Sequence, residues 1–104
     1  MRLTKEQISH FHTVLDRFLD ADKYQLYLFG SRIMDQFKGG DIDLVILTDS
    51  HGKKIFQESH LDILVEFKKS PLVGQRRIDI KAATSEDFKT DPFLKSIQSE
   101  MILI

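Results

Sequence analysis

The chain has 104 residues, with 15 Lys and Arg against 16 Asp and Glu, a formal net charge of −1 and no cysteine. This length supports a single domain, residues 1–104, with one core. The balanced charge argues against an extended nucleic-acid surface, the lack of thiols excludes a disulfide scaffold, and no apolar run approaches the ~20 residues that cross a bilayer. We therefore expect a soluble, cytoplasmic α+β domain that is not attached to a membrane.

The first quarter of the chain predicts a helix followed by a buried strand. Thr4 and Gln7 have the spacing of a capping box, in which each side chain accepts a hydrogen bond from the other's backbone N–H. The helix should end near Asp20–Asp22. Its apolar stripe recurs at three- and four-residue steps, at Ile8, Phe11, Leu15, Phe18 and Leu19. Residues 24–29 are almost entirely apolar and aromatic, which predicts a strand with both faces at least partly covered.

A second strand is predicted after a short helical connection. Ser31 is suited to cap a helix over about 31–37. Gly39 and Gly40 then allow a tight turn into a strand over 42–48.

The pattern then returns to a helix and a third strand. Residues 49–52 have the composition of a loop, and a helix is predicted over 53–69, stopped by Pro71. Residues 76–81 alternate between charged and apolar side chains, as expected for a strand.

The C-terminal segment predicts two short helices and a buried tail. Ser85 is expected to cap one turn of helix, and Asp91 followed by Pro92 should begin a last helix that ends near Ser99. Residues 101–104 are all apolar and should be buried, either in this chain or in a partner. The order of elements predicts a mixed β-sheet with helices packed on it.

Two carboxylates stand together at the start of the second strand. Side chains alternate along a strand, so Asp41 and Asp43 share a face, with Cα atoms ~6.5–7 Å apart. Such a pair is repulsive unless a cation lies between the two groups, and Mg²⁺ prefers oxygen ligands of this kind. The alternative is that the two acids only keep the strand end hydrated.

A third carboxylate follows in the third strand. Asp79 lies between two isoleucines that face the other way, so it would join the other two acids if these strands are neighbours. Three carboxylates on adjacent strands suit a site for two metal ions. Alternatively, Arg77 and Lys81, which share its face, neutralise Asp79.

A segment suited to binding phosphate lies between the first strand and the short helix. Glycine at position 30 allows close approach of the backbone, Ser31 offers a hydroxyl, and Arg32 can contact an anion through two N–H groups. The alternative is an ordinary strand-to-helix turn with a serine cap. In combination with the three carboxylates, however, this segment indicates a nucleotide site.

These motifs resemble those of the minimal nucleotidyltransferases in the DNA polymerase β superfamily. The resemblance covers nearly the whole chain and is carried by residues 28–32 (Leu-Phe-Gly-Ser-Arg), residues 40–44 (Gly-Asp-Ile-Asp-Leu) and Asp79. It implies a nucleotidyltransferase-like fold and a site in which ATP or another nucleoside triphosphate is bound with two Mg²⁺ ions. The implied metal ligands are Asp41, Asp43 and Asp79, and the implied phosphate-binding residues are Gly30 and Ser31, beside Arg32.

The resemblance also implies a reaction and a class of partner. The reaction is transfer of a nucleoside monophosphate, AMP in the first instance, to a hydroxyl of a protein or another acceptor. Many minimal members act beside a separate helical partner of the HEPN type in toxin–antitoxin systems. The alternative function is therefore an antitoxin-type binding module that neutralises such a partner with little or no catalysis, and homo-oligomerisation is left open.

Overall fold

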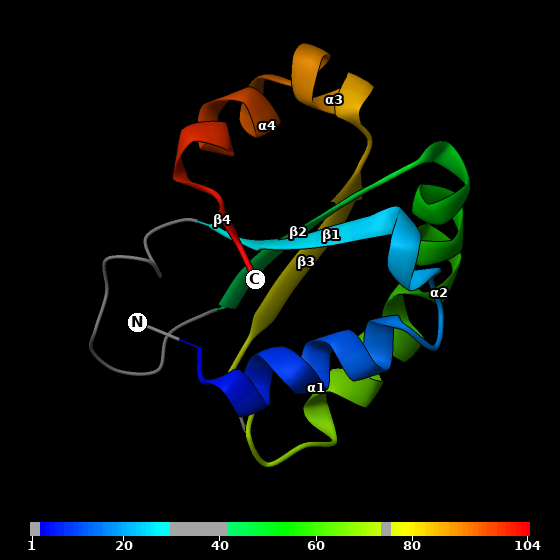
Figure 1. Cartoon of the computed structure of the whole chain (residues 1–104), viewed down its shortest axis with the longest axis vertical. Coiled ribbons are helices and arrows are strands. Elements are labelled where there is room, and N and C mark those ends of the chain that lie inside the picture. Colours follow the sequence, from blue (N-terminus) through cyan, green and yellow to red (C-terminus); the bar gives the residue numbers. More distant parts are fainter. Residues whose placement is uncertain (1–2, 30–41, 74–75) are drawn as a thin grey trace.

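The computed structural model describes residues 3–29, 42–73 and 76–104 as a four-stranded sheet with helices on both faces (Figure 1). The strand order is β3-β2-β1-β4, in which β2 and β3 are parallel and the other pairs are antiparallel. The predicted mixed sheet is therefore confirmed. The elements are α1 (Lys5–Leu15), η1 (Ala21–Lys23), β1 (Tyr24–Leu28), β2 (Ile42–Thr48), α2 (Ser50–Lys68), β3 (Ile78–Ala83), α3 (Ser85–Thr90), α4 (Pro92–Ile97), η3 (Gln98–Glu100) and β4 (Ile102–Leu103).

One face of the sheet forms the larger core. Because side chains alternate along each strand, Leu44 of β2 and Ile80 of β3 point to the same face, where α1 and α2 cover them. Phe11 of α1 and Phe67 of α2 meet edge to face there, with ring centroids 4.8 Å apart. Both rings are fully buried, so this contact joins the two helices beneath the sheet.

The opposite face is only partly covered. Val45 and Ala83 lie on this face, and α3 and α4 cover them with Phe88, Leu94 and Ile97 in a second, smaller cluster. Figure 1 shows these two helices above the sheet, opposite α1. Asp43 and Asp79 lie on this second face, close to the ends of their strands, where Phe29 of the smaller cluster adjoins Asp43.

The predicted start of α1 is confirmed, but its predicted end is not. Thr4 and Gln7 form the capping box. The helix ends at Leu15, because the next N–H groups, those of Arg17 and Phe18, bond to carbonyls three residues back and tighten the chain. This turn still brings Leu19 into the core.

The prediction of a loop over residues 49–52 is wrong. Asp49 is the N-cap of α2, and its Oδ1 accepts a hydrogen bond from the Gly52 N–H at 2.7 Å. Gly52 lies so close to Thr48 that a Cβ atom would overlap the threonine hydroxyl. The glycine therefore serves close packing inside the first turn of a helix.

The two C-terminal helices begin close to their predicted positions. Thr84, not Ser85, caps α3 through a capping box with Asp87, and the helix continues past the predicted single turn to Thr90. Asp91 caps α4 as predicted, with Pro92 at its first position. Asp87 also accepts a hydrogen bond from Lys53 Nζ at 2.7 Å, which ties α3 to α2.

The tail is not completely buried in this chain, which was one of the two predicted alternatives, and burial in a partner stays a prediction. Residues 102–103 form β4, which pairs with β1 and closes one edge of the sheet. Ile102 and Leu103 are 46% and 59% exposed, whereas Met101 and Ile104 pack against the two clusters. The tail thus satisfies its backbone by strand pairing and buries only part of its apolar surface.

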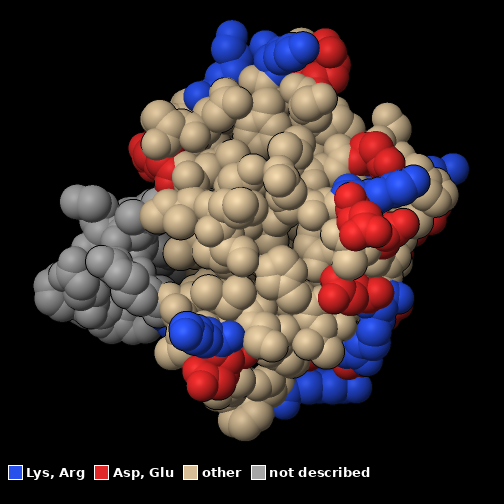
Figure 2. Space-filling model, in the orientation of Figure 1, with Lys and Arg blue, Asp and Glu red and all other residues tan. Residues whose placement is uncertain are grey.

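The surface around β4 carries little charge. Figure 2 shows charged side chains mostly around the rim of the face seen in Figure 1, with few over its centre, where β4 lies. Among the described helices, none combines the length and apolarity required to cross a bilayer.

The ion pair between Lys53 of α2 and Asp87 of α3 should contribute to stability in a pH-dependent way. The side-chain hydrogen bond from Lys53, and then the backbone N–H of Thr84, lower the pKa of Asp87. The ionised Asp87 carboxylate therefore stabilises the fold fully above the ordinary carboxyl pKa of about 3.9. This stabilisation is lost as pH falls through the lowered pKa of Asp87 in the folded protein. Asp87→Asn should lower the free energy of unfolding by about 1 kcal/mol at neutral pH.

Urea unfolding of both proteins at neutral pH and at acid pH tests this expectation. The difference between the wild type and Asp87→Asn should narrow in acid. Glu86→Gln, which changes the neighbouring exposed carboxylate, is the matched control and should show little difference at either pH. An equal difference at both pH values for Asp87→Asn would contradict the role of the ionised carboxylate.

Candidate active site

Asp43 and Asp79 face each other on the two parallel strands. Each is the second residue of its strand, and the register pairs Asp43 of β2 directly with Asp79 of β3. Paired residues on neighbouring strands share a face, and the strands themselves lie ~4.8 Å apart. The structure therefore brings together two of the three predicted carboxylates, as expected if the third strand neighbours the second.

The two carboxylates lie where solvent can reach them. Asp43 is half-buried and Asp79 is exposed, whereas their neighbours Ile42 and Ile78 are buried on the other face. Within the described residues, the Asp79 side chain has no hydrogen bond or ion pair. Asp79 thus lies open to a ligand on its side of the sheet.

The alternative in which Lys81 neutralises Asp79 does not match the structure. Lys81 lies two residues further along β3, on the same face, but its Nζ atom is 4.8 Å from the ring centroid of Phe93. The ammonium group is therefore held over an aromatic ring of α4. Neither the position of this ring nor the contact was predicted, because the periodicity of residues 76–81 gives no information on which helix lies above the strand.

The C-terminal end of β1 reaches the same end of the sheet. The N–H of Phe29 donates to the carbonyl oxygen of Asp43 at 3.1 Å, and the N–H of Ile42 donates to that of Arg77 at 2.8 Å. Phe29 is buried and directly precedes the predicted phosphate-binding segment in the sequence. The last described residue before that segment is therefore bonded to the backbone of Asp43, one of the two acids.

Several predicted features lie outside the described residues. They are the phosphate-binding residues Gly30, Ser31 and Arg32, the carboxylate Asp41, the short helix over 31–37 and the turn at Gly39 and Gly40. These assignments remain predictions.

The donor set of the described pair suits a hard divalent cation. Two carboxylates on one face of a sheet supply the oxygen ligands that Mg²⁺ takes from proteins, where water and substrate phosphates complete its coordination. Over residues 3–29, 42–73 and 76–104, no group of three or more His, Cys, Asp or Glu side chains is placed to hold a metal. A three-carboxylate site would thus need Asp41 in addition to the described pair.

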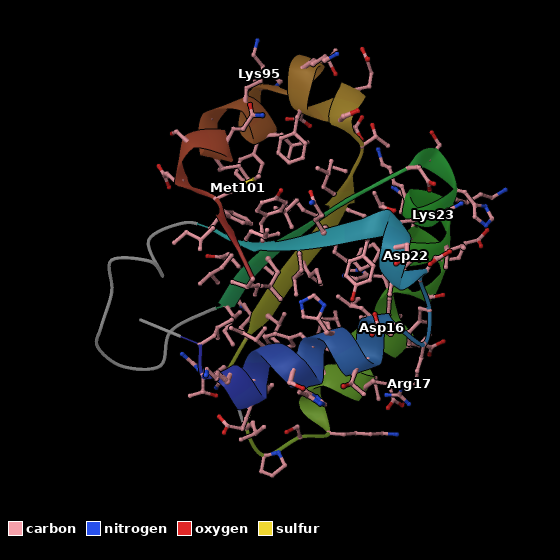
Figure 3. All side chains as sticks on the ribbon, in the orientation of Figure 1. Asp16, Arg17, Asp22, Lys23, Lys95 and Met101 are labelled. Atoms are coloured by element: carbon pink, nitrogen blue, oxygen red, sulfur yellow. The ribbon has the colours of Figure 1, made fainter. Side chains whose placement is uncertain are left out.

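Two hollows of the surface lie away from this pair. One, of about 580 Å³, is bordered by Asp22 and Lys23 at the far end of β1, and the other, of about 590 Å³, by Lys95 and Met101. Figure 3 labels these four residues and shows the first two near the start of β1 and the other two around α4. Neither hollow contains Asp43 or Asp79.

The fold and the paired strand carboxylates define a domain suited to metal-assisted phosphoryl-type transfer. The family model of the nucleotidyltransferase domain matches residues 11–104, and the chain belongs to this family. The chain is therefore a transferase that moves a nucleoside monophosphate, with a nucleoside triphosphate as its substrate. No curated protein matched the chain significantly.

The paired carboxylates predict a measurable response to magnesium. If Asp79 is a ligand, Mg²⁺ should raise the thermal unfolding midpoint of the wild type, because a ligand that binds only the folded state stabilises it. Asp79→Asn should lose most of this rise. Without Mg²⁺ the variant should be about as stable as the wild type, because the exposed Asp79 side chain has no hydrogen bond or ion pair within the described residues.

Differential scanning calorimetry with and without MgCl₂ measures both effects. Asp62→Asn, which removes an exposed carboxylate from α2, is the matched control and should keep the wild-type response. An undiminished Mg²⁺ response in Asp79→Asn would show that this carboxylate does not hold the ion.

Proposed function

We propose that this protein transfers AMP from ATP to a hydroxyl group of a protein or another acceptor, with Mg²⁺ held by Asp41, Asp43 and Asp79. The observation that carries the proposal is the parallel register that pairs Asp43 with Asp79 on the partly covered face of the sheet. Membership of the nucleotidyltransferase domain family supports the general reaction. The nucleotide, the acceptor and the metal ligands are the parts that are proposed.

The proposed roles follow from the position of each side chain. Asp43 is half-buried between β1 and β3 and would hold the metal and the triphosphate. Asp79 is more exposed, which suits a carboxylate that also helps to position and activate the acceptor hydroxyl. When bound between such groups, Mg²⁺ lowers the pKa of a hydroxyl and neutralises charge that develops on the phosphates.

The segment after β1 would bind the phosphates. Gly30, Ser31 and Arg32 directly follow Phe29, whose N–H is bonded to the Asp43 backbone. This connection supports a phosphate-binding role next to the carboxylates. Catalysis would then consist mainly of positioning and charge neutralisation, since no side chain needs to form a covalent intermediate.

Transfer of labelled nucleotide tests the proposed reaction. The wild type, ATP labelled at the α-phosphate, Mg²⁺ and a whole-cell protein and RNA fraction should give a labelled acceptor. ATP labelled at the γ-phosphate should not, because pyrophosphate is the leaving group. Asp43→Asn should reduce labelling by at least ~10²-fold, since it removes a charge that acts on the reacting phosphate.

Matched reactions make this result specific. Asp62→Asn should label the acceptor like the wild type, and unlabelled ATP should compete at least as well as any other nucleoside triphosphate. Undiminished labelling by Asp43→Asn would refute its catalytic role, and labelling from the γ-phosphate would indicate a kinase reaction. Better competition by another triphosphate would refute ATP as the preferred donor.

A second candidate function is the neutralisation of a helical partner protein of the HEPN type. It is favoured by an exposed apolar stripe on α2, where Leu61 and Val65 lie one helical turn apart and are 75% and 56% exposed. Such a stripe can pack against a helix of another protein.

Binding to a purified HEPN-type protein separates the two candidates. If neutralisation is the function, Leu61→Lys should weaken the complex at least tenfold, whereas Asp43→Asn should leave it unchanged. Glu86→Lys, which adds positive charge at an exposed position of α3 and not of α2, is the matched control. Equal binding by Leu61→Lys and the wild type would exclude this stripe as the contact surface.

A further inference from the structure

An exposed aromatic ring and a cation lie together beside the candidate active site. The Nζ atom of Lys81 is 4.8 Å from the ring centroid of Phe93, the second residue of α4. Phe93 is nevertheless 46% exposed, so much of this side chain is accessible to a ligand. The pair combines a flat apolar surface with a positive charge.

Both residues are connected to the strands that carry the acids. Lys81 follows Asp79 by two residues on β3 and therefore lies on the same face, with Cα atoms ~6.5–7 Å apart. Phe93 contacts the ring of Phe29 edge to face, with centroids 6.0 Å apart. Phe29 is in turn bonded through its N–H to the Asp43 carbonyl, so the aromatic ring adjoins the same end of the sheet.

Packing alone does not account for both features of this pair. Leu94 and Ile97 of α4 belong to the smaller cluster and are buried. Phe93 on the same helix instead contacts Lys81 and remains accessible. Lys81 forms no ion pair within the described residues, so its ammonium group can also meet an anion. A nucleotide has the matching chemistry, because it carries an aromatic base and a polyanionic phosphate chain.

We propose that Phe93 is the stacking surface for the base of the nucleoside triphosphate and that Lys81 contacts its phosphates. This inference rests on the proposed function. It assigns to the nucleotide site one residue of α4, Phe93, and one residue of β3, Lys81. Stacking on an aromatic ring is tolerant of base identity and increases with the area of the base. The subsite therefore favours purine over pyrimidine nucleotides without distinguishing adenine from guanine.

Titration calorimetry with Mg²⁺ and two probes tests the subsite. The probes are a non-hydrolysable ATP analogue and inorganic tripolyphosphate, which lacks a base. Phe93→Leu, which keeps the apolar packing on Phe29, should weaken binding of the ATP analogue about tenfold and leave the affinity for tripolyphosphate unchanged. Lys81→Met should weaken binding of both probes by similar factors.

Matched variants and a second pair of probes complete the test. Lys89→Met, which removes an exposed cation from α3, should bind both probes like the wild type. A non-hydrolysable GTP analogue should bind with the same affinity as the ATP analogue. A non-hydrolysable CTP analogue should bind more weakly than either. Circular dichroism and thermal unfolding establish that each variant is folded.

The outcomes separate this inference from the proposed function. Wild-type affinity for the ATP analogue in both Phe93→Leu and Lys81→Met would overturn the subsite and leave the nucleotidyltransferase reaction in place. Equal weakening of both probes by Phe93→Leu would assign that residue a structural role and overturn base stacking. Failure of the wild type itself to bind the ATP analogue would refute the proposed function and this inference with it.

Discussion

The parallel pairing of β2 with β3 is the constraint on which the site depends. Side chains alternate along a strand, so a shift of the register by one residue would put Asp79 opposite a residue of the other face. Burial of the isoleucines beside the two acids opposes such a shift, because it would move Ile78 and Ile80 out of the core. The apolar packing under the sheet thus holds the acidic residues above it.

The two faces of the sheet are covered to different extents. On one face, α1 and α2 cover the strands with a continuous apolar core. On the face of the proposed site, the described helices α3 and α4 cover the part around Val45 and Ala83. The end of the strands that carries Asp43 and Asp79 stays accessible, and that exposure is what charged groups need in order to bind a substrate without a large desolvation cost.

Sequence signals predicted the local structure correctly where that structure depends only on residues within one helix or strand. The capping box of Thr4 and Gln7, the bounds of β2 and the Asp91-Pro92 helix start are all confirmed, because each depends on neighbouring residues. The loop predicted over residues 49–52 was wrong, because Gly52 lies inside α2 and lets this helix pack closely against Thr48. The apolar tail is only partly buried in this chain, since hydrophobicity does not show whether a segment enters a core or pairs along a sheet edge.

Short motifs and the two-residue repeat of strands were sufficient to predict the family, the mixed sheet and the charged face of each strand. That β2 and β3 are neighbours, and that Asp43 is therefore paired with Asp79, follows from the packing of elements that are distant in the chain. The same packing puts Lys81 over the ring of Phe93 on α4, instead of pairing it with Asp79 on its own strand. Such contacts depend on how helices and strands pack in space, and the spacing of residues within one element carries no information about that packing.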